Sequence, residues 1–354
     1  MMRLSQAEWD WVVPQARRSD LLARLAALAT AQGIIGEIDP RPRAHLLSAL
    51  TLESAQKDEV GAELADLARI LGPLEIPVVL LKGAAYVLAE LPAASGRMFS
   101  DIDILVPKSA LSAVESELMQ NGWMTTHHDA YDQRYYREWM HELPPMQHLR
   151  RGTVLDVHHA LLPETARHHP HTGLLLEASY TVGAYPPLRV LAPVDMVLHS
   201  MSHLFHNEEF SHGLRDLSDL DLLLRHFGKR DGFWQELPAR AAILDLRRPL
   251  HYGLVMAHEV LGTPVPADTL GAVSRFGPSR PMLGLMRALW RRALRPQHHS
   301  AKGSLAPLAL QCLYVRSHWL RMPPGLLVRH LLYKAWKRRA DAWRKQPEEA
   351  AVAQ

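Results

Sequence analysis

Residues 100–106 read Ser-Asp-Ile-Asp-Ile-Leu-Val, and this short stretch decides how the rest of the chain is interpreted. In an extended strand, residues i and i+2 point to the same face. Asp101 and Asp103 therefore stand side by side, while Ile102 and Ile104 point into a core. Two neighbouring carboxylates repel each other, and a divalent cation with hard oxygen ligands, Mg²⁺ or Mn²⁺, removes that cost. The stretch predicts a strand that carries a metal site.

A third carboxylate follows on another predicted strand, residues 153–158, where Asp156 lies between apolar residues. If the two strands are neighbours, Asp101, Asp103 and Asp156 converge. Such a set can hold two cations, activate an attacking oxygen and stabilise the oxygen that leaves a displaced phosphate. His158 lies on the same strand face as Asp156, where it orients a carboxylate or contacts a nucleotide. An isolated Asp-x-Asp pair is usually a surface feature, but the apolar flanks and the third carboxylate favour the metal site.

Upstream, residues 77–81 form an apolar run after a proline and predict a buried strand. Lys82 and Gly83 follow, and a helix is expected over residues 84–91. A glycine between a strand and a helix lets the backbone approach a phosphate closely, and a helix N-terminus attracts anions. Lys82 adds a positive charge for a triphosphate. A single Lys-Gly pair is weak evidence, but this pair lies shortly before Asp101.

The remaining pattern predicts an α+β or α/β fold, with a small mixed-sheet core between two helical regions. Helical periodicity over residues 16–72 ends at a Gly-Pro pair, and helices return after about residue 190. Further strands are expected at 123–128 and 147–150, with a hairpin turn at residues 151–152. The predicted units are a helical region 1–75, the core 76–190, a helical domain with a basic end 191–345, and a disordered tail 346–354.

Composition bounds the class of protein. The chain has 354 residues, 47% of them hydrophobic and 22% charged, which excludes a wholly disordered or fibrous protein. The only cysteine is Cys312, so no internal disulfide can form. No apolar stretch approaches the roughly 18 residues of a spanning helix, and the start has no signal-type apolar segment. We therefore expect a cytoplasmic protein without a transmembrane segment.

Charge is distributed unevenly along the chain. Residues 1–250 contain 24 basic and 32 acidic residues, whereas residues 251–354 contain 16 and 5. Basic residues alternate with Trp and Leu from about residue 310 to residue 345, a pattern typical of a basic amphipathic helix. Such a helix packs its apolar stripe on the body of the protein, or it contacts nucleic acid or an anionic membrane. No recognisable nucleic-acid-reading module accompanies it, so nucleic-acid binding is not favoured.

Histidines are the other compositional feature, with 14 of the 21 between residues 127 and 226. His199, His203 and His206 share one face of a predicted helix, since their spacing is i, i+4 and i+7. Two histidines four residues apart can bind zinc, but no glutamate lies between them as in a metalloprotease helix. This face is expected to line the cleft opposite the carboxylates, or to pack within the helical domain.

Together these motifs resemble a known family. A strand, a Gly-containing turn, a helix, Arg-x-x-Ser-Asp-x-Asp and a later strand aspartate are similar to the polymerase-β-type nucleotidyltransferase superfamily. Residues 80–85, 97–106 and 155–158 resemble bacterial nucleotidyltransferase family 5, whose members have a Leu-Lys-Gly turn, an Arg before Asp-x-Asp and an acidic-x-His strand. His203 and residues 217–220 also resemble that family. The resemblance covers about residues 20–230.

The resemblance implies a set of site residues and a reaction. The metal ligands, which also bind a nucleoside triphosphate and act as catalytic residues, are Asp101, Asp103 and Asp156. The nucleotide-binding residues are Lys82, Gly83, Arg97, Ser100 and His158. The implied reaction uses Mg²⁺ or Mn²⁺ to transfer a nucleoside monophosphate from an NTP to an unidentified small-molecule, peptide or protein acceptor, and pyrophosphate leaves. The acceptor is expected between the sheet and the C-terminal helices.

One residue departs from the superfamily pattern. The superfamily typically has Gly-Ser at the turn, where the hydroxyl contacts phosphate, whereas Ala84 follows Gly83 here. This difference supports an alternative, a catalytically silent nucleotidyltransferase-like binding protein of a biosynthetic cluster. A second alternative is a nucleic-acid-binding protein that acts through the basic C-terminal helices.

Overall fold

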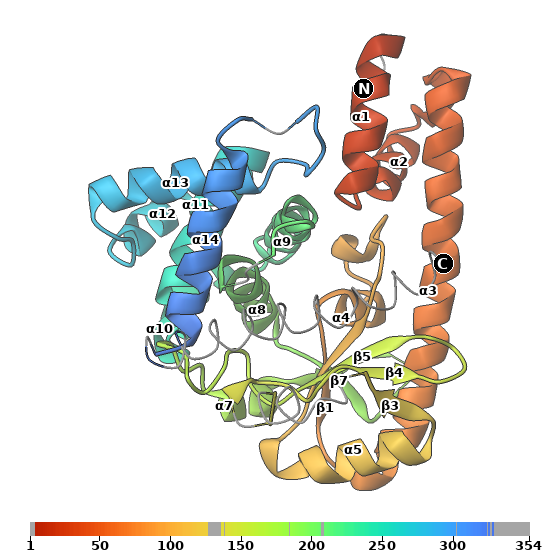
Figure 1. Ribbon diagram of the computed structural model, residues 1–354, viewed down its shortest axis with the longest axis vertical. Coiled ribbons are helices and arrows are strands. Elements are labelled where there is room, and N and C mark those ends of the chain that lie inside the picture. Colours follow the sequence, from red (N-terminus) through yellow and green to blue (C-terminus); the bar gives the residue numbers. More distant parts are fainter. Residues whose placement is uncertain are drawn as a thin grey trace, which may run out of the picture.

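The computed structural model describes residues 4–126, 136–137, 139–183, 185–206, 209–301, 303–323, 325 and 328. Within these ranges the chain has the expected mixed α+β fold, a seven-stranded sheet surrounded by helices (Figure 1). The strands are β1 (Val78–Leu81), β2 (Ile102–Leu105), β3 (Trp123–Thr125), β4 (Met146–His148), β5 (Val154–His158), β6 (Tyr180–Thr181) and β7 (Leu188–Val190).

The helices lie mainly before and after the sheet in sequence. The helices before β3 are α1 (Gln6–Arg18), α2 (Leu22–Ala31), α3 (Pro40–Leu71), α4 (Lys82–Leu88) and α5 (Leu111–Gln120). The later ones are α7 (Thr172–Ala178), α8 (Pro193–His206), α9 (Gly213–Phe227), α10 (Phe233–Ile243), α11 (Arg247–Leu261), α12 (Ala267–Ser274), α13 (Arg280–Ala293) and α14 (Ala306–Arg321). None of them combines the length and the hydropathy needed to cross a bilayer, in the part of the chain described.

The sheet order is β3-β4-β5-β2-β1-β7-β6, so the strands that carry the predicted site are central. β2 pairs with β1 in antiparallel and with β5 in parallel orientation, and β1 also pairs with β7 in parallel. All four residues of β1 and all four of β2 are buried. Such strands read as continuous apolar runs, which is why residues 77–81 were recognisable in the sequence.

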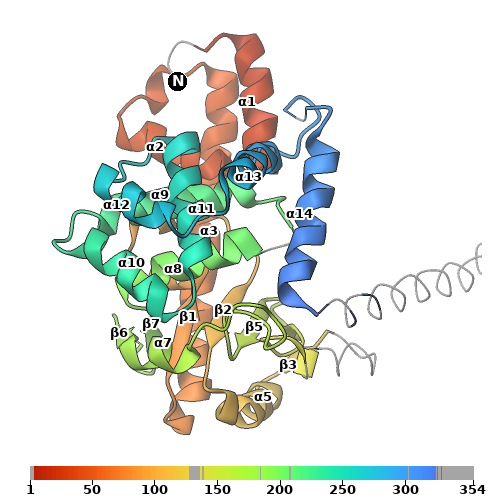
Figure 2. The same cartoon turned by 90° about the vertical axis from the view of Figure 1, so that its left-hand side faces the viewer.

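Helices cover the two faces of the sheet differently. In Figures 1 and 2, α5 lies below the sheet and α8 and α9 lie above it. Helix α3 is 32 residues long, starts at Pro40 and ends before Gly72-Pro73, as expected from the sequence. Its second half joins the main core, while its first half packs with α1 and α2 around Trp9 and Leu46 in a smaller cluster.

The structure adds secondary-structure elements that the sequence did not predict. Helix α1 lies inside the predicted helical region 1–75 but mostly before the periodicity at residues 16–72, and α7 and α12 were not predicted. Residues 236–262, where the sequence pattern is helical, contain most of α10 and α11, which are separated where Asp245 adopts a positive φ of 54°. Strands β6 and β7 were also missed, because they have only two and three residues and Pro186-Pro187 precedes β7. Both strands lie inside the predicted core 76–190, so the sheet of that core has more strands than the sequence predicted.

One further expectation is confirmed, and several others concern residues that the structure does not describe. Residues 151–152 do form the turn of the β4–β5 hairpin, where Gly152 has a φ of 76°. The end of the strand predicted at 123–128 lies outside the described residues, as do most of the basic segment after residue 323 and the tail 346–354. The predicted domain limits stay predictions.

Candidate active site

Strand register brings the predicted carboxylates together at one end of the central strands. In the parallel pair β2–β5, Asp103 lies directly opposite Asp156. Asp101 precedes β2 by one residue, and one ligand oxygen from each of the three carboxylates lies within 4.8 Å of the others. In the antiparallel pair β1–β2, Leu81 lies opposite Asp103. Lys82, the next residue, is therefore also close to Asp103. The expected convergence of three carboxylates is confirmed.

Asp103 is the most buried of the three carboxylates, with its side chain 3% exposed. Its Oδ1 accepts a hydrogen bond from Lys82 Nζ at 2.7 Å and lies 3.0 Å from His158 Nε2. Burial alone would raise the pKa of Asp103, but the Lys82 and His158 charges outweigh it and hold the pKa well below its usual range. Asp103 is therefore a carboxylate anion whose Oδ1 contacts both Lys82 and His158.

Asp156 has the opposite environment. Its Oδ1 is buried and has no hydrogen-bond partner among the described residues. Burial, and then the negative charges of Asp103 and Glu142, raise the pKa of Asp156 to about 7. Asp101 is partly exposed and accepts a hydrogen bond from Ser100 Oγ at 2.8 Å. A buried oxygen without a partner beside two other carboxylates is the arrangement that a cation would complete.

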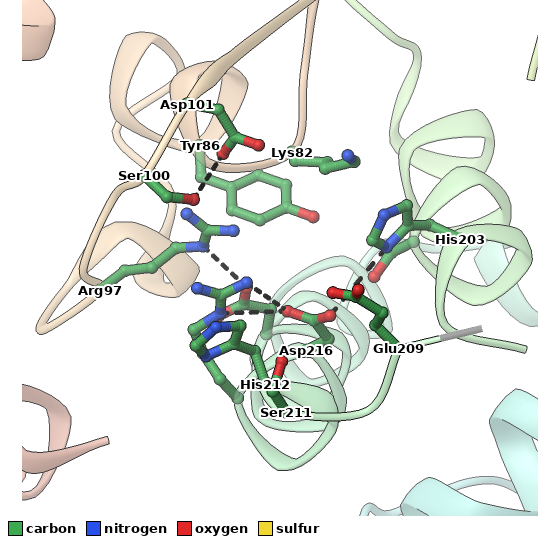
Figure 3. Close-up of a pocket in the computed structure, with 13 residues that line it drawn as sticks. Lys82, Tyr86, Arg97, Ser100, Asp101, His203, Glu209, Ser211, His212 and Asp216 are labelled. Atoms are coloured by element: carbon green, nitrogen blue, oxygen red, sulfur yellow. Dashed lines mark hydrogen bonds and ion pairs between the residues drawn. The ribbon is translucent and has the colours of Figure 1, made fainter. Parts of the chain in front are cut away.

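A cavity of about 300 Å³ opens beside this carboxylate cluster, between the sheet and helices α8 and α9 (Figure 3). It lies where the sequence predicted a cleft. Its lining residues are Lys82, Tyr86, Arg97, Ser100, Asp101, Ser200, His203, Glu209, Ser211, His212, Arg215, Asp216 and Asp219. The lining is mostly polar and charged, so the cavity suits a polar ligand.

Arg97 reaches this cavity from the loop before β2 and is tied to the C-terminal helices. Its Nε donates to Asp219 Oδ2 of α9 at 2.8 Å, and Arg24 Nη1 of α2 donates to Asp219 Oδ1 at 2.6 Å. All three side chains are less than one-tenth exposed. The Arg97 guanidinium also lies over the rings of Tyr86 and Phe99. Asp219 thus joins the N-terminal helices, the sheet and α9 through one carboxylate.

Gly83 is needed because of Arg97. A Cβ at Gly83 would lie 2.2 Å from Arg97 Nη1 and 2.9 Å from Phe99, so only glycine leaves room for the guanidinium. Gly83 is not among the residues that line the cavity, and Ala84 is buried in the main core. The predicted contact of Gly83 with phosphate stays a prediction, as do the predicted roles of Arg97 and Ser100.

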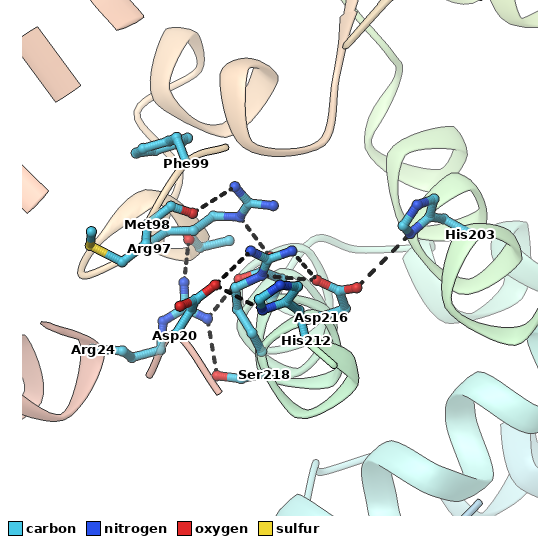
Figure 4. Close-up of polar contacts among 12 residues, drawn as sticks. Asp20, Arg24, Arg97, Met98, Phe99, His203, His212, Asp216 and Ser218 are labelled. Atoms are coloured by element: carbon cyan, nitrogen blue, oxygen red, sulfur yellow. Dashed lines mark hydrogen bonds and ion pairs between the residues drawn. The ribbon is translucent and has the colours of Figure 1, made fainter. Parts of the chain in front are cut away.

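A second polar group completes the far side of the cavity (Figure 4). Asp20 lies 2.8 Å from His212 Nδ1, and Arg215 donates to Asp216 at 3.0 Å. His203 Nδ1 lies 4.0 Å from Asp216 Oδ2. These residues connect the end of α1 to α8 and α9. Three separate segments therefore shape the wall that faces the carboxylates.

The three histidines on one face of α8, His199, His203 and His206, have two different environments. His203 lines the cavity, whereas His199 and His206 are buried. Burial lowers the pKa of both His199 and His206 to about 3, so both imidazoles are neutral. His206 Nδ1 donates to the Ser202 carbonyl at 3.2 Å. Both expected roles, lining the cleft and packing in the helical domain, occur on this face.

The sequence missed several residues of this site. Glu142 and His141 follow a segment without a clear pattern, and Asp20 and Arg24 lie in a helical region with no chemical motif. The sequence did contain a signal for Asp219, because this residue lies among the apolar residues of α9 and is buried with them. A carboxylate inside such a stripe predicts a buried cationic partner.

A comparison with protein families agrees with this geometry. The sequence model of a family described as "Uncharacterised nucleotidyltransferase" matches residues 5–262. The chain belongs to this nucleotidyltransferase family. The match contains the three carboxylates, Lys82, Arg97 and Asp219, and it ends after α11. No curated protein sequence matches the chain.

Two solved structures show limited similarity to this chain. The crystal structure of ANT(2″)-Ia in complex with adenylyl-2″-tobramycin covers 52% of this chain and 97% of its own, with 15% identity and a TM-score of 0.37. The solution structure of the antibiotic-resistance factor ANT(2″)-Ia covers 58% of this chain and 98% of its own, with 13% identity and a TM-score of 0.35.

Proposed function

We propose that this protein is a metal-dependent nucleotidyltransferase that moves a nucleoside monophosphate from an NTP to an acceptor. The observation that carries the proposal is the convergence of Asp101, Asp103 and Asp156 at the wall of a cavity that also presents Lys82 and Arg97. Carboxylates suit divalent cations, and the two basic side chains suit the phosphates of a nucleotide.

The carboxylates would hold the cation or cations, Mg²⁺ or Mn²⁺. The donor set fits, because all three side chains supply oxygen and the buried Asp156 Oδ1 has no protein partner in the described part of the chain. When bound, such cations neutralise phosphate charge and stabilise the leaving oxygen of the reaction.

The chain's own residues perform the remaining tasks in this proposal. Lys82 and Arg97 bind the triphosphate, and Asp219 keeps the Arg97 guanidinium in place. An oxygen of the acceptor forms a bond to the α-phosphorus, and the bond between that phosphorus and the bridging oxygen of pyrophosphate breaks. Asp156, with its raised pKa, orients the acceptor hydroxyl and takes its proton. The electron pair of the broken bond leaves with pyrophosphate.

The acceptor in this proposal is a polar molecule with a free hydroxyl or phosphate. Ser200, Ser211, His203 and Glu209 line the cavity wall opposite Asp101 and supply hydrogen-bonding groups. A small molecule, or the end of a peptide or protein, could present its oxygen there. The cytoplasmic location expected from the sequence stays a prediction.

Calorimetry tests the nucleotide-binding part of the proposal. The wild type is titrated with each NTP in the presence of Mg²⁺ or Mn²⁺, and again with a chelator. We expect binding only with metal, and its loss in Asp101→Asn and Asp156→Asn. Asp268→Asn, an exposed change on α12, is the matched control and should bind like the wild type. A wild type that binds no NTP with either metal would refute the proposal.

Transfer activity separates the enzyme from the silent binding protein, the alternative that Ala84 supports. The wild type is incubated with α-labelled NTPs, metal and a cell lysate. An enzyme transfers label to a lysate component, and Asp156→Asn abolishes the transfer. Metal-dependent NTP binding without any label transfer would instead support the silent binding protein.

A further inference from the structure

A second cluster of metal-ligating side chains lies behind the carboxylates, and the proposed transfer reaction does not use it. It consists of His141, Glu142 and His158, and one ligand atom from each lies within 4.8 Å of the others. The backbone fixes this cluster, because residues 141–143 pair along β5. His159 N donates to the His141 carbonyl at 2.8 Å, and Glu142 bridges to His158.

One distance within the cluster matches a tetrahedral zinc site, and a second is about half an ångström longer. Zn²⁺ binds imidazole nitrogen and carboxylate oxygen at about 2.0–2.2 Å, so two ligand atoms of a tetrahedron lie about 3.4 Å apart. Glu142 Oε2 lies 3.2 Å from His158 Nδ1 and 4.0 Å from His141 Nε2. The two imidazole rings are 5.3 Å apart and tilted by 35°. These spacings leave room for one ion and for a fourth ligand such as water.

His158 already has the outer partner that metal-bound histidines usually have. A histidine that ligates through one ring nitrogen almost always donates its other N–H to a carboxylate, carbonyl or water. Here Nδ1 faces Glu142, and Nε2 lies 3.0 Å from Asp103 Oδ1. An ion on Nδ1 would fix the proton on Nε2, directed at Asp103.

The imidazole of His141 is only 14% exposed, and its Nδ1 has no hydrogen-bond partner in the described ranges. No described group therefore fixes which of its two nitrogens faces Glu142, and Nε2 is the one that faces it here. Glu142 supplies the anionic ligand of this cluster, with its Oε2 3.2 Å from His158 Nδ1. Two imidazoles beside a carboxylate are a ligand set for a cation.

We infer that His141, Glu142 and His158 form a binding site for Zn²⁺, distinct from the carboxylate site for the nucleotide's metal. Two nitrogen ligands favour zinc, whereas three carboxylates favour Mg²⁺ or Mn²⁺. The two sites are joined by the hydrogen bond between His158 and Asp103. Zinc would therefore hold the segment at residues 141–143 on β5 and keep His158 directed at Asp103. The inference does not rest on the transfer reaction.

Zinc content of the purified full-length chain tests this site without nucleotide. The protein is stripped with a chelator, dialysed against zinc, and its metal is counted by mass spectrometry. We expect about one tightly bound zinc per chain. His141→Ala and Glu142→Gln should each weaken binding by more than about 100-fold, since loss of an outer partner alone costs 10–100-fold. Cobalt(II) should give the intense visible absorption of a low-coordinate nitrogen site, which an all-oxygen octahedral site lacks.

Two controls exclude other zinc sites, and circular dichroism checks that each variant folds. Asp101→Asn/Asp156→Asn disrupts the carboxylate site and should retain the zinc. His298→Ala/His299→Ala removes a pair of neighbouring imidazoles elsewhere, with ring centroids 4.1 Å apart, and should also retain the zinc. Zinc that remains in folded His141→Ala and Glu142→Gln, or a wild type that binds none, would overturn the inference. His158 would then be a protonated imidazole between Asp103 and Glu142.

Discussion

Asp219 joins three parts of the chain, so Asp219→Asn tests the fold and the site together. Its carboxylate, with 4% of the side chain exposed, accepts hydrogen bonds from Arg24 of α2 and from Arg97 of the loop before β2. Asparagine has nearly the same shape but no charge. The substitution therefore leaves two buried guanidinium groups without their anion, at little steric cost.

The expected loss is large because both partners are buried. Removing one member of a buried ion pair costs about 3–5 kcal/mol, a substantial share of a typical total stability of about 5–15 kcal/mol. At roughly 2 °C per kcal/mol, the melting temperature should fall by on the order of 6–10 °C. The surface pair of Arg230 with Glu236, with side chains 47% and 51% exposed, gives the matched control. Glu236→Gln should cost about 0–1 kcal/mol.

Urea unfolding followed by circular dichroism measures both variants, at pH 7 and in acid. The Arg97 and Arg24 charges outweigh burial and lower the pKa of Asp219. Its stabilisation is therefore complete above the unfolded pKa of about 3.9 and is lost as the pH falls further. The difference in the free energy of unfolding between wild type and Asp219→Asn should therefore be smaller in acid than at pH 7. If Asp219→Asn at pH 7 costs no more than Glu236→Gln, the argument about the buried ion pair is wrong.

Three further predictions follow from the same geometry. Lys82→Met should weaken metal-dependent NTP binding by about 10–100-fold in calorimetry, because a charge-assisted contact to phosphate is lost. Gly83→Ala should lower the free energy of unfolding by about 1–3 kcal/mol, since its Cβ collides with Arg97. His199, with a folded pKa of about 3, destabilises the fold as the pH falls below 6.5, by about 2 kcal/mol at pH 5. His199→Gln should flatten that part of a stability–pH profile.

Much of the carboxylate cluster could be predicted from sequence because it depends on local patterns. Strand periodicity sets Asp101 beside Asp103, and an apolar strand around Asp156 makes it a neighbour once the two strands pair. Lys82 joins this cluster because β1 and β2 are antiparallel partners whose register places the end of β1 beside Asp103. Each step needed only residues within one strand and one assumption about pairing.

The rest of the site depends on contacts between distant segments, which no local pattern encodes. Arg97 and Asp219 are 122 residues apart, and Arg24 and Asp219 are 195 apart. The structure gives position 83 a reason to be glycine that no local pattern encodes, since a Cβ there would collide with the Arg97 guanidinium. The predicted contact of Gly83 with phosphate stays a prediction. Glu142 reaches His158 through a single bridge that has no strand signature in the sequence. Tertiary packing decides these features.

The residues that line the cavity help to interpret the uneven distribution of charge along the chain. Its basic side chains are Lys82, Arg97 and Arg215, and all of its lining residues precede residue 220. In the described part of the chain, the basic excess after residue 250 therefore does not face the cavity.

Arg316 of α14 shows what one of those later basic residues does instead. It donates to the Phe205 carbonyl at the end of α8 and lies over the rings of Tyr252 and Trp290. Its role is to pack α14 against the helices that carry the cavity wall. Because the family match ends at residue 262, α14 supports α8 from outside the matched region. In the proposed reaction the acceptor would therefore contact α8 and α9, which line the cavity, and not α14.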